Sequence, residues 1–285
     1  MKKFLITMMG LLVVLSCGQK PASSSDDDEE DVDDVATEEV ETTKPLELKT
    51  YTFSDTVGMA HTDISIEFPV KGEKKLVHAI RRYLAEHIEL ESDEVELRDG
   101  QGMTDYYGRR IMNRMEELAA GYEDDDYVNE VYHDWSFSKL YEDDKVVTFL
   151  AFTSLYEGGI HGISHQDGLT FFKDRGQLFS FDMMKNTDSE EFVDLLCEGL
   201  RKYFSPKDGE LIDDEALNEE LISVEGLENI PLPVAHPYIT DKGVHIIYQP
   251  YEVSYYAAGM PEFDIPLKKI RPFLTKKAKQ LLDLE

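Results

Sequence analysis

Apolar and polar residues alternate with two different periods in the first part of the chain, and these periods predict its strands and helices. The segments LKTYTFSDTV and HTDISIEFPV alternate with a period of two, as half-buried strands do. The segments GEKKLVHAIRRYLAEHI and TDYYGRRIMNRMEELAAGY repeat their apolar residues every three or four positions, which is typical of amphipathic helices. Thr104 is expected to cap the second helix. A β-β-α-α lobe is therefore predicted over residues 46–130.

From residue 131 the pattern predicts consecutive hairpins interrupted by helices. Polar turns at Glu142–Lys145 and Asp174–Gly176 each join two strands. Two helices follow, in DSEEFVDLLCEGLRKYF, with Asp188 as its cap, and in DDEALNEELI. A hairpin turning at residues 241–243, a short strand EFDIPL and a basic helix KKIRPFLTKKAKQLLDL complete the chain. This order predicts an α+β fold, a mostly antiparallel sheet of consecutive hairpins packed by several helices in two lobes. Because nothing alternates as βαβ, a doubly wound nucleotide-binding fold is not expected.

The first residues, MKKFLITMMGLLVVLSCGQ, have the architecture of a signal peptide over residues 1–16. The apolar run Phe4–Leu15 is too short to cross ~30 Å of hydrocarbon comfortably as a permanent helix. The segment Val14–Cys17 resembles a bacterial lipobox. That resemblance implies cleavage before Cys17, a diacylglycerol on its sulfur and an acyl chain such as palmitate on its amine. An uncleaved anchor and an ordinary signal peptide are the alternatives. Cys197, the other cysteine, is expected to be buried as a small apolar residue.

Residues 17–45 form an acidic segment without aromatic residues or a regular period. Such a segment cannot bury enough apolar surface to offset its ordering entropy, so we expect a disordered, extended tether. Its SDDDEED block resembles export signals of surface lipoproteins, and we expect a lipid anchor in the outer membrane, with surface display and a plain spacer as alternatives. The net charge of −30 argues against nucleic acid, and it is compatible with a cationic partner or with solubility alone.

The segment YEGGIHGISHQDG lies between two predicted strands and carries the candidate chemistry. Its glycines, Gly158, Gly159 and Gly162, can each adopt positive φ without steric cost. The chain can therefore bulge and reverse, which leaves the imidazole of His161 at an edge. We interpret the segment as a strand connection in which His161 hydrogen-bonds the backbone and holds the turn.

Metal binding and catalysis are the alternatives for this segment. On an extended strand, His161 and His165 would share a face but stand about 13 Å apart, which is too far for one zinc ion. The sequence contains no G-x-S-x-G elbow and no phosphate-binding loop ending in Lys-Ser/Thr. We therefore expect no metal, no cofactor and no enzymatic activity, with an envelope hydrolase that uses His161 as a base as the alternative.

A second segment, QPYEVSYYAAGMPEF, gathers tyrosines between two prolines. Tyrosines combine an apolar ring with a wet hydroxyl and are favoured at protein interfaces and as platforms for sugars. The segment is either such a binding loop or a loop that packs its aromatic rings beside the glycine turn, and Glu252 is expected to cap or anchor it. The candidate binding or structural residues are Tyr156, Gly158, Gly159, His161, Gly162, Tyr251, Glu252, Tyr255, Tyr256 and Gly259.

Both segments resemble patterns of a known extracytoplasmic domain. YEGGIHG, followed by GLTFFKDRGQLFSFDMM, and then YQPYEVSYYAAGMPEFDIPLKKIRPFL resemble, in order and spacing, the C-terminal domain of RsiV-type anti-sigma factors. The same domain of unknown function precedes the catalytic domain of PdaC-type peptidoglycan deacetylases. The resemblance covers residues 131–274 and implies an α+β binding domain at 131–285, after a smaller preceding domain.

In RsiV this domain recognises lysozyme, a strongly cationic protein. The resemblance therefore implies a cell-envelope binding protein whose candidate ligands are a lysozyme-like cationic protein or peptidoglycan. The chain has no sigma-binding segment, and it ends at Glu285 without a deacetylase domain. We accordingly expect neither an anti-sigma role nor deacetylase activity.

Overall fold

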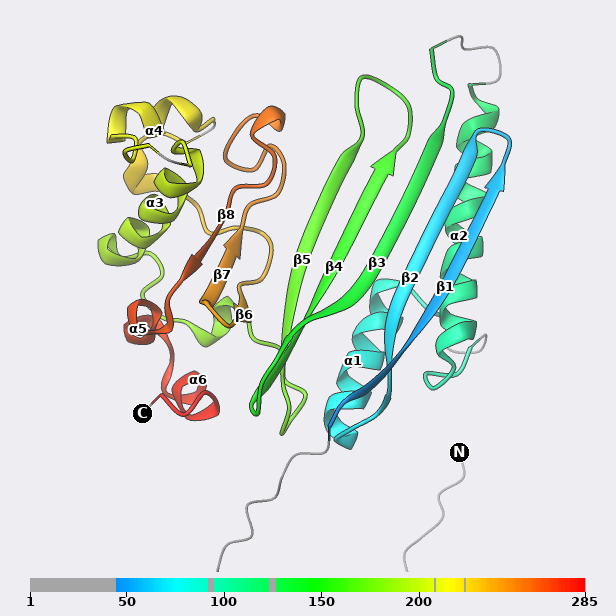
Figure 1. The fold of residues 1–285 in the computed structure, drawn as a ribbon, viewed down its shortest axis with the longest axis horizontal. Helices are drawn as coiled ribbons and strands as arrows, with labels where there is room; N and C mark the ends of the chain where they lie inside the picture. The colour runs from blue at the N-terminus through cyan, green and yellow to red at the C-terminus, as the bar shows by residue number, and fades with distance from the viewer. Residues whose placement is uncertain (1–44, 92–94, 123–126, 208, 223, 285) are drawn as a thin grey trace, which may run out of the picture. The chain divides into compact units, whose positions relative to one another are not determined.

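The strands in the described part of the chain form two sheets (Figure 1). The computed structural model describes residues 45–91, 95–122, 127–207, 209–222 and 224–284. The larger sheet has the order β1-β2-β3-β4-β5, and the smaller one has the order β6-β7-β8. The strands of the larger sheet are β1 (Glu47–Val57), β2 (Ala60–Lys71), β3 (Val131–Glu142), β4 (Val146–Tyr156) and β5 (Ile163–Phe172). Those of the smaller sheet are β6 (Tyr238–Thr240), β7 (Gly243–Ile247) and β8 (Glu262–Ile265).

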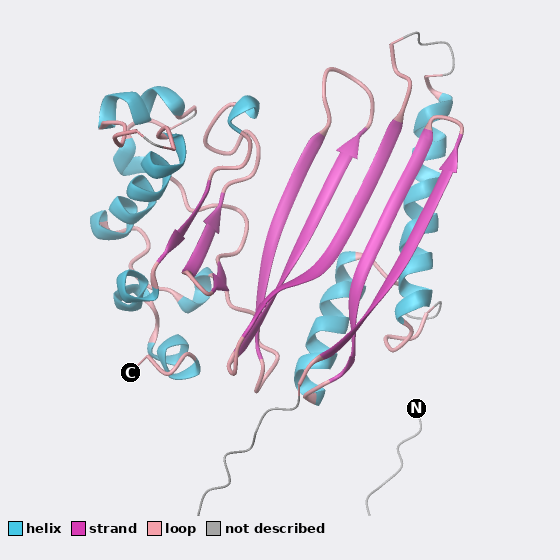
Figure 2. Cartoon of the chain, in the orientation of Figure 1, coloured by secondary structure: helices cyan, strands magenta, loops and turns pink. Residues whose placement is uncertain are grey.

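Two helices, α1 (Lys74–His87) and α2 (Gly100–Ala120), cover one face of the larger sheet (Figure 2). The period of two places Ile64, Ile66 and Phe68 of β2 on that face, where they are buried. The period of 3.6 places Leu76 and Ile80 of α1 against them. The buried faces of the strands and helices pack together in one continuous apolar layer. The predicted mixed α+β fold is confirmed.

The smaller sheet packs with a second set of helices. These are α3 (Glu190–Phe204), α4 (Asp214–Glu220), α5 (Leu267–Ile270) and α6 (Lys276–Leu281). Short 3-10 turns occur at Phe181–Met183, Leu227–Asn229, Tyr256–Ala258 and Arg271–Phe273. Phe192 and Leu196 of α3 and Val244 and Ile246 of β7 belong to the apolar cluster that joins these elements. The described part of the chain therefore has two main apolar clusters, and the strands β4 and β5 contribute residues to both.

The connection between β2 and β3 differs from the predicted succession of hairpins. These strands pair in parallel, with Ile64 opposite Trp135, and the chain between them passes through α1 and α2. A parallel pair needs such a crossover, because the chain must return to the same end of the sheet. The expectation that no β-α-β connection occurs was therefore wrong at this point, although the other pairings of the larger sheet are antiparallel.

Two helix caps differ from the sequence prediction. Asp99 caps α2 by accepting a hydrogen bond from the Gly102 amide at 2.9 Å. Thr104 lies one turn further on, buried, and donates to the Gly100 carbonyl at 2.8 Å. The cap of α3 is Ser189, one residue after Asp188. Before α3 two adjacent residues, Asp188 and Ser189, have capping side chains, and at α2 Asp99 and Thr104 are five residues apart, so local sequence alone does not select among them.

Two C-terminal elements are shorter than predicted. After the turn at Gly176, the expected second strand is reduced to the isolated bridge between Phe171 and Leu178. The final basic helix breaks into α5, a 3-10 turn and α6. Pro272 cannot donate to a helical hydrogen bond, and Leu274 instead pairs with Met184.

The two sheets are joined by close backbone contacts. The hydroxyl of Thr148 donates to the Ile239 carbonyl at 2.7 Å, and the Ile239 amide donates to the Thr170 hydroxyl at 2.8 Å. The ring of Tyr238 lies where a Cβ on Gly168 would stand, since such an atom would be 1.9 Å from its Cδ1. Gly168 is therefore required for space.

The described residues from 45 onward form one compact unit, and the predicted lobe boundary near residue 130 falls between paired strands of one sheet. The division into a small lobe and a C-terminal domain stays a prediction. The predicted signal peptide, the lipidated Cys17 and the tether up to residue 44 lie outside the described residues. Among the residues that are described, no helix combines the length and apolar character that crossing a bilayer requires.

A partly buried imidazole makes the stability of this core sensitive to acid. His133 lies on β3, and its ring meets that of Tyr107 edge-on with centroids 6.4 Å apart. Burial, followed by the positive charge of Arg114, lowers the pKa of His133 to about 4. The pKa in the unfolded chain is about 6.5, so the unfolded state binds this proton more readily.

We therefore expect the free energy of unfolding to fall as the pH decreases from about 6.5 to about 4. The variant His133→Gln should show a shallower pH dependence in this window, measured by urea unfolding at each pH. His78→Gln, at an exposed position on α1, is the control and should keep the original dependence. An equal pH dependence of the free energy of unfolding in His133→Gln and in the unmodified protein would contradict the role given to His133.

Candidate functional site

The glycine-rich connection between β4 and β5 is a loop whose backbone is shaped by two different requirements. Gly158 and Gly159 have φ angles of +88° and +107°, which side chains with a Cβ rarely adopt. Gly162 has no positive φ, and it is needed for space instead. A Cβ there would lie 2.9 Å from the Leu155 carbonyl oxygen and 3.1 Å from the Tyr132 hydroxyl.

His161 sits at the centre of an aromatic cluster that joins this loop to the C-terminal tyrosine loop. Its ring stacks on Tyr256, with centroids 3.7 Å apart and an interplanar angle of 17°. Its Nδ1 lies 2.9 Å from the Gly162 carbonyl oxygen, and its Nε2 lies 3.1 Å from the Tyr251 hydroxyl. A carbonyl can only accept, so Nδ1 carries the proton and, in the neutral ring, Nε2 accepts from Tyr251. The Tyr256 hydroxyl donates to the same Gly162 carbonyl at 2.6 Å.

The tyrosine loop is held in place by backbone contacts on both sides. Glu252 accepts from the amides of Val234 at 2.6 Å and Gln249 at 2.7 Å, so its carboxylate anchors the loop. The side-chain amide of Gln249 pairs with both backbone groups of Gln166 on β5, at 3.1 Å and 2.8 Å.

The other end of the tyrosine loop is fixed as well. Gly259 has a φ of +76°, and the preceding carbonyl, that of Ala258, accepts from the Tyr203 hydroxyl at 2.5 Å. Both ends of the loop are therefore held by hydrogen bonds.

Several side chains on these two loops remain open to solvent. Ile160, at the tip of the glycine loop, is fully exposed, and Tyr251 and Tyr255 are 50% and 55% exposed. Tyr156 is partly buried and donates to the Gly159 carbonyl at 2.9 Å. Of the candidate residues, the structure brings His161, Gly162, Tyr251 and Tyr256 into direct contact, with Tyr156 supporting the glycine loop.

The chemistry available to His161 is limited by its partners, which are a carbonyl and a phenol. His165 lies on β5 opposite Thr153 and is exposed. Within the described ranges, no group of three or more His, Cys, Asp or Glu residues is arranged to hold a metal ion.

A cleft of about 620 Å³ between the two sheets contains a titratable group that sequence reasoning missed. Nδ1 of His245 lies 2.9 Å from the Asp264 carboxylate, and Nε2 lies 3.4 Å from that of Glu262. Burial lowers the pKa of His245, but the nearby carboxylates of Glu262 and Asp264 outweigh it, so the pKa is raised. His245 and Asp264 are cross-strand neighbours, which an alternation pattern in sequence does not reveal.

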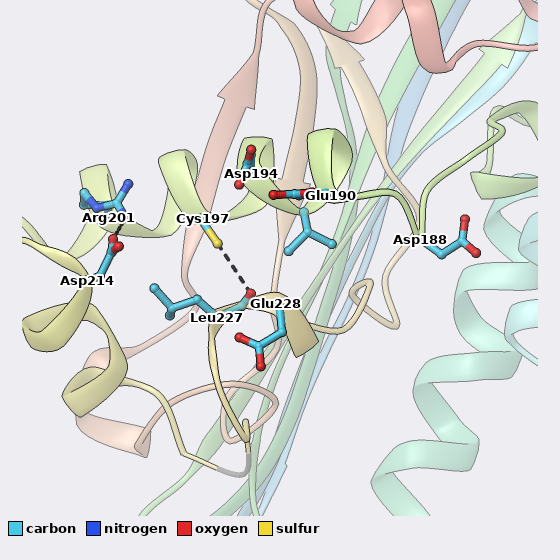
Figure 3. Close-up of a pocket in the computed structure, with 9 residues that line it drawn as sticks. Asp188, Glu190, Asp194, Cys197, Arg201, Asp214, Leu227 and Glu228 are labelled. Atoms are coloured by element: carbon cyan, nitrogen blue, oxygen red, sulfur yellow. Dashed lines mark hydrogen bonds and ion pairs between the residues drawn. The ribbon is translucent and has the colours of Figure 1, made fainter.

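A second cavity, of about 530 Å³, lies beside α3 (Figure 3). Carboxylates of Asp188, Glu190, Asp194 and Glu228 line it, and Arg201 pairs with Asp214. The Cys197 thiol points toward the Leu227 carbonyl oxygen, 3.6 Å away. Burial raises the pKa of Cys197, so the thiol stays protonated, and its predicted burial is confirmed.

Comparison with known proteins finds a family model that matches part of this chain. Residues 182–268 match the model described as "Protein of unknown function (DUF3298)". This range includes the tyrosine loop, whereas the glycine loop precedes it. No protein of curated function matches the sequence.

Two crystal structures of DUF3298 family proteins resemble this one. The first, from Bacteroides fragilis, has a TM-score of 0.64 and 19% identity, over 86% of this chain and 99% of that chain. The second, from Pseudomonas aeruginosa, has a TM-score of 0.56 and 14% identity, over 82% of this chain and 96% of that chain. Likeness at such identities shows the fold alone. The finer resemblance to RsiV- and PdaC-type domains stays a prediction.

If His161 holds the two loops together, its replacement should lower stability. We expect His161→Gln to reduce the free energy of unfolding by about 1 kcal/mol, because a packed ring and its two hydrogen bonds are disturbed. His165→Gln, at another exposed histidine, which lies on β5 outside the contact between the two loops, should change it by less than about 0.5 kcal/mol. Urea unfolding measures both values, and amide exchange should be faster across residues 157–162 in the first variant alone. Equal stability of the two variants would contradict a structural role for His161.

Proposed function

We propose that this protein is a lipid-anchored binding protein of the bacterial cell envelope. In this proposal Cys17 carries the lipid that anchors the chain in the outer membrane. The ligand contacts the surface formed by the glycine loop, residues 156–162, and the tyrosine loop, residues 250–259. The proposal for the anchor rests on the signal-peptide architecture and the lipobox-like segment ending at Cys17.

The observation that carries the binding proposal is the convergence of two loops separated by 90 residues at the pair His161 and Tyr251. The His161 ring bridges the loops, and Glu252 fixes the backbone of the second one. A surface whose backbone is already ordered loses less conformational entropy when it binds a ligand. Exposed side chains on these loops are therefore well placed to serve as contact residues.

The exposed side chains favour a protein ligand. The aliphatic side chain of Ile160 is fully exposed, and the rings of Tyr251 and Tyr255 are about half exposed. Such aromatic and aliphatic anchors commonly carry the binding energy of protein interfaces. The net charge of −30 favours a cationic partner, because the field of the protein attracts it at low salt. A lysozyme-like cationic protein is therefore the first candidate ligand, and peptidoglycan is the second.

The alternative of a hydrolase with His161 as its base has no such support. A general base needs a positioned nucleophile or water, and it commonly needs a second group that orients the ring. The partners of His161 are a backbone carbonyl and a tyrosine hydroxyl, which hold the ring between two loops. The proposed protein binds its ligand and does not turn it over.

Binding should depend on the exposed tips of both loops. We expect hen lysozyme, as the cationic probe, to bind the purified protein saturably in isothermal titration, with affinity falling as salt rises. The double variant Ile160→Asp, Tyr255→Ala should weaken this binding by about tenfold or more, because it removes two exposed anchors. Leu211→Asp, at a residue that is 60% exposed outside both loops, is the matched control. Soluble peptidoglycan fragments are titrated in parallel, and no saturable binding of either probe would remove both named ligands.

The lipid anchor can be tested separately in cells. We expect the unmodified protein to incorporate labelled palmitate and to sediment with the outer membrane, because several acyl chains hold a protein firmly to a bilayer. Cys17→Ser should abolish the label and release the protein from that fraction. Cys197→Ser is the matched control and should keep both, since that thiol is buried in the folded domain. Membrane association of Cys17→Ser would contradict the assignment.

A further inference from the structure

A groove with an apolar floor and a basic rim runs between α1 and the turn at residues 173–176. Its volume is about 380 Å³, which lies in the range of small-molecule sites. The apolar side chains that line it are Ala79, Tyr83, Phe171 and Leu178. The basic side chains that line it are Lys75, His78, Arg82 and Arg175.

The turn that carries Arg175 is fixed against α1. Gly176 has a φ of +68°, and a Cβ there would lie 2.6 Å from the Lys75 carbonyl oxygen and 2.7 Å from the Ala79 Cβ. The backbone of the turn therefore approaches the helix as closely as glycine allows. On the other side, the buried Lys173 ammonium donates to Glu142 at 3.0 Å and to the Asp143 carbonyl at 2.9 Å. Arg175 is thus presented beside α1 by a turn anchored at both sides.

The basic rim stands out against the charge of the chain, which is −30 overall. Lys75, His78 and Arg82 follow one another at spacings of three and four residues, so they share one face of α1. The first turn of α1 contains no acidic residue, although the positive end of the helix dipole favours one there. Lys74 and Lys75 add to the dipole, whereas the carboxylate of Glu73, which caps α1, accepts from the Lys74 amide at 3.1 Å and offsets part of this charge. The basic character of the rim therefore rests on the side chains of α1 and Arg175.

The carboxylates near the rim hold its cations only weakly. Glu86 pairs with Arg82, and Asp174 pairs with Arg175 at 2.7 Å. All four side chains are more than half exposed. Exposed pairs of this kind contribute about 0–1 kcal/mol, so a ligand anion can take the place of either carboxylate.

We propose that this groove binds an amphipathic anion, a lipid-like molecule with a phosphate headgroup and an aliphatic chain. The headgroup lies among Lys75, His78 and Arg175, where arginine can bind two phosphate oxygens at once. The chain lies over the partly exposed side chains of Tyr83 and Leu178, above the buried ring of Phe171, and covers apolar surface that water otherwise contacts. This surface is distinct from the two loops of the proposed function, and the inference does not depend on that function.

The experiment uses monomeric decyl phosphate as the probe, titrated into the full purified chain below the micelle concentration. We expect decyl phosphate to bind saturably. Inorganic phosphate, which lacks the aliphatic chain, and decyl maltoside, which lacks the negative charge, should each bind at least about tenfold more weakly. Arg82→Glu, Arg175→Glu should weaken decyl phosphate binding by about tenfold or more, since two attractive charges become repulsive. Lys202→Glu, Lys276→Glu changes the net charge by the same amount at exposed lysines outside the groove, and it should leave binding unchanged.

Each alternative outcome overturns the proposal in a recognisable way. Equal affinity for inorganic phosphate would mean a simple anion site, and equal affinity for decyl maltoside would mean an apolar patch without charge selection. Equal weakening in both charge-reversed variants would mean attraction by net charge alone. Chemical shift changes on binding should centre on the ring of Tyr83 and the methyl groups of Leu178, and changes confined to residues elsewhere would also refute the site.

Discussion

The contact between the Tyr238 ring and the bare backbone at Gly168 is the constraint on which the arrangement of the two sheets depends. At that point the smaller sheet lies directly against β5, and Thr148 and Thr170 satisfy the backbone of Ile239 from the larger sheet. Buried polar groups are costly when left unpaired, so this network specifies one position of β6 on β4 and β5. On either side of this contact, β4 and β5 contribute residues to both main apolar clusters.

The candidate binding surface depends on this contact between the two sheets. With β6 and β7 fixed, the segment after β7 passes beside β5, where Gln249 pairs with the backbone of Gln166. The tyrosine loop then meets the glycine loop, and His161 closes the gap between them. Residues far apart in sequence become one surface because both ends of each loop are set by strands whose positions are already determined.

Charge is distributed unevenly over this fold. Carboxylates dominate the cavity beside α3, where Cys197 is kept protonated by burial, and they surround His245 between the sheets. The groove along α1 has the opposite character, with a basic rim above an apolar floor. Surfaces of opposite sign on one domain allow ligands of opposite charge to bind at separate places, because exposed charges are screened beyond about 10 Å at moderate salt.

The sequence by itself determined the elements that depend on neighbouring residues. Periods of two and of 3.6 identified β1, β2, α1 and the strands β3–β5, and the glycines at 158 and 159 marked a loop that needs positive φ. The tertiary structure decided the parallel pairing of β2 with β3, the end of the strand after Gly176 and the break at Pro272. It also decided which polar groups meet, such as His161 with Tyr251 and His245 with Asp264. The physical reason is that periodicity records which face of an element is buried, whereas partner and register depend on how buried faces from distant segments pack together.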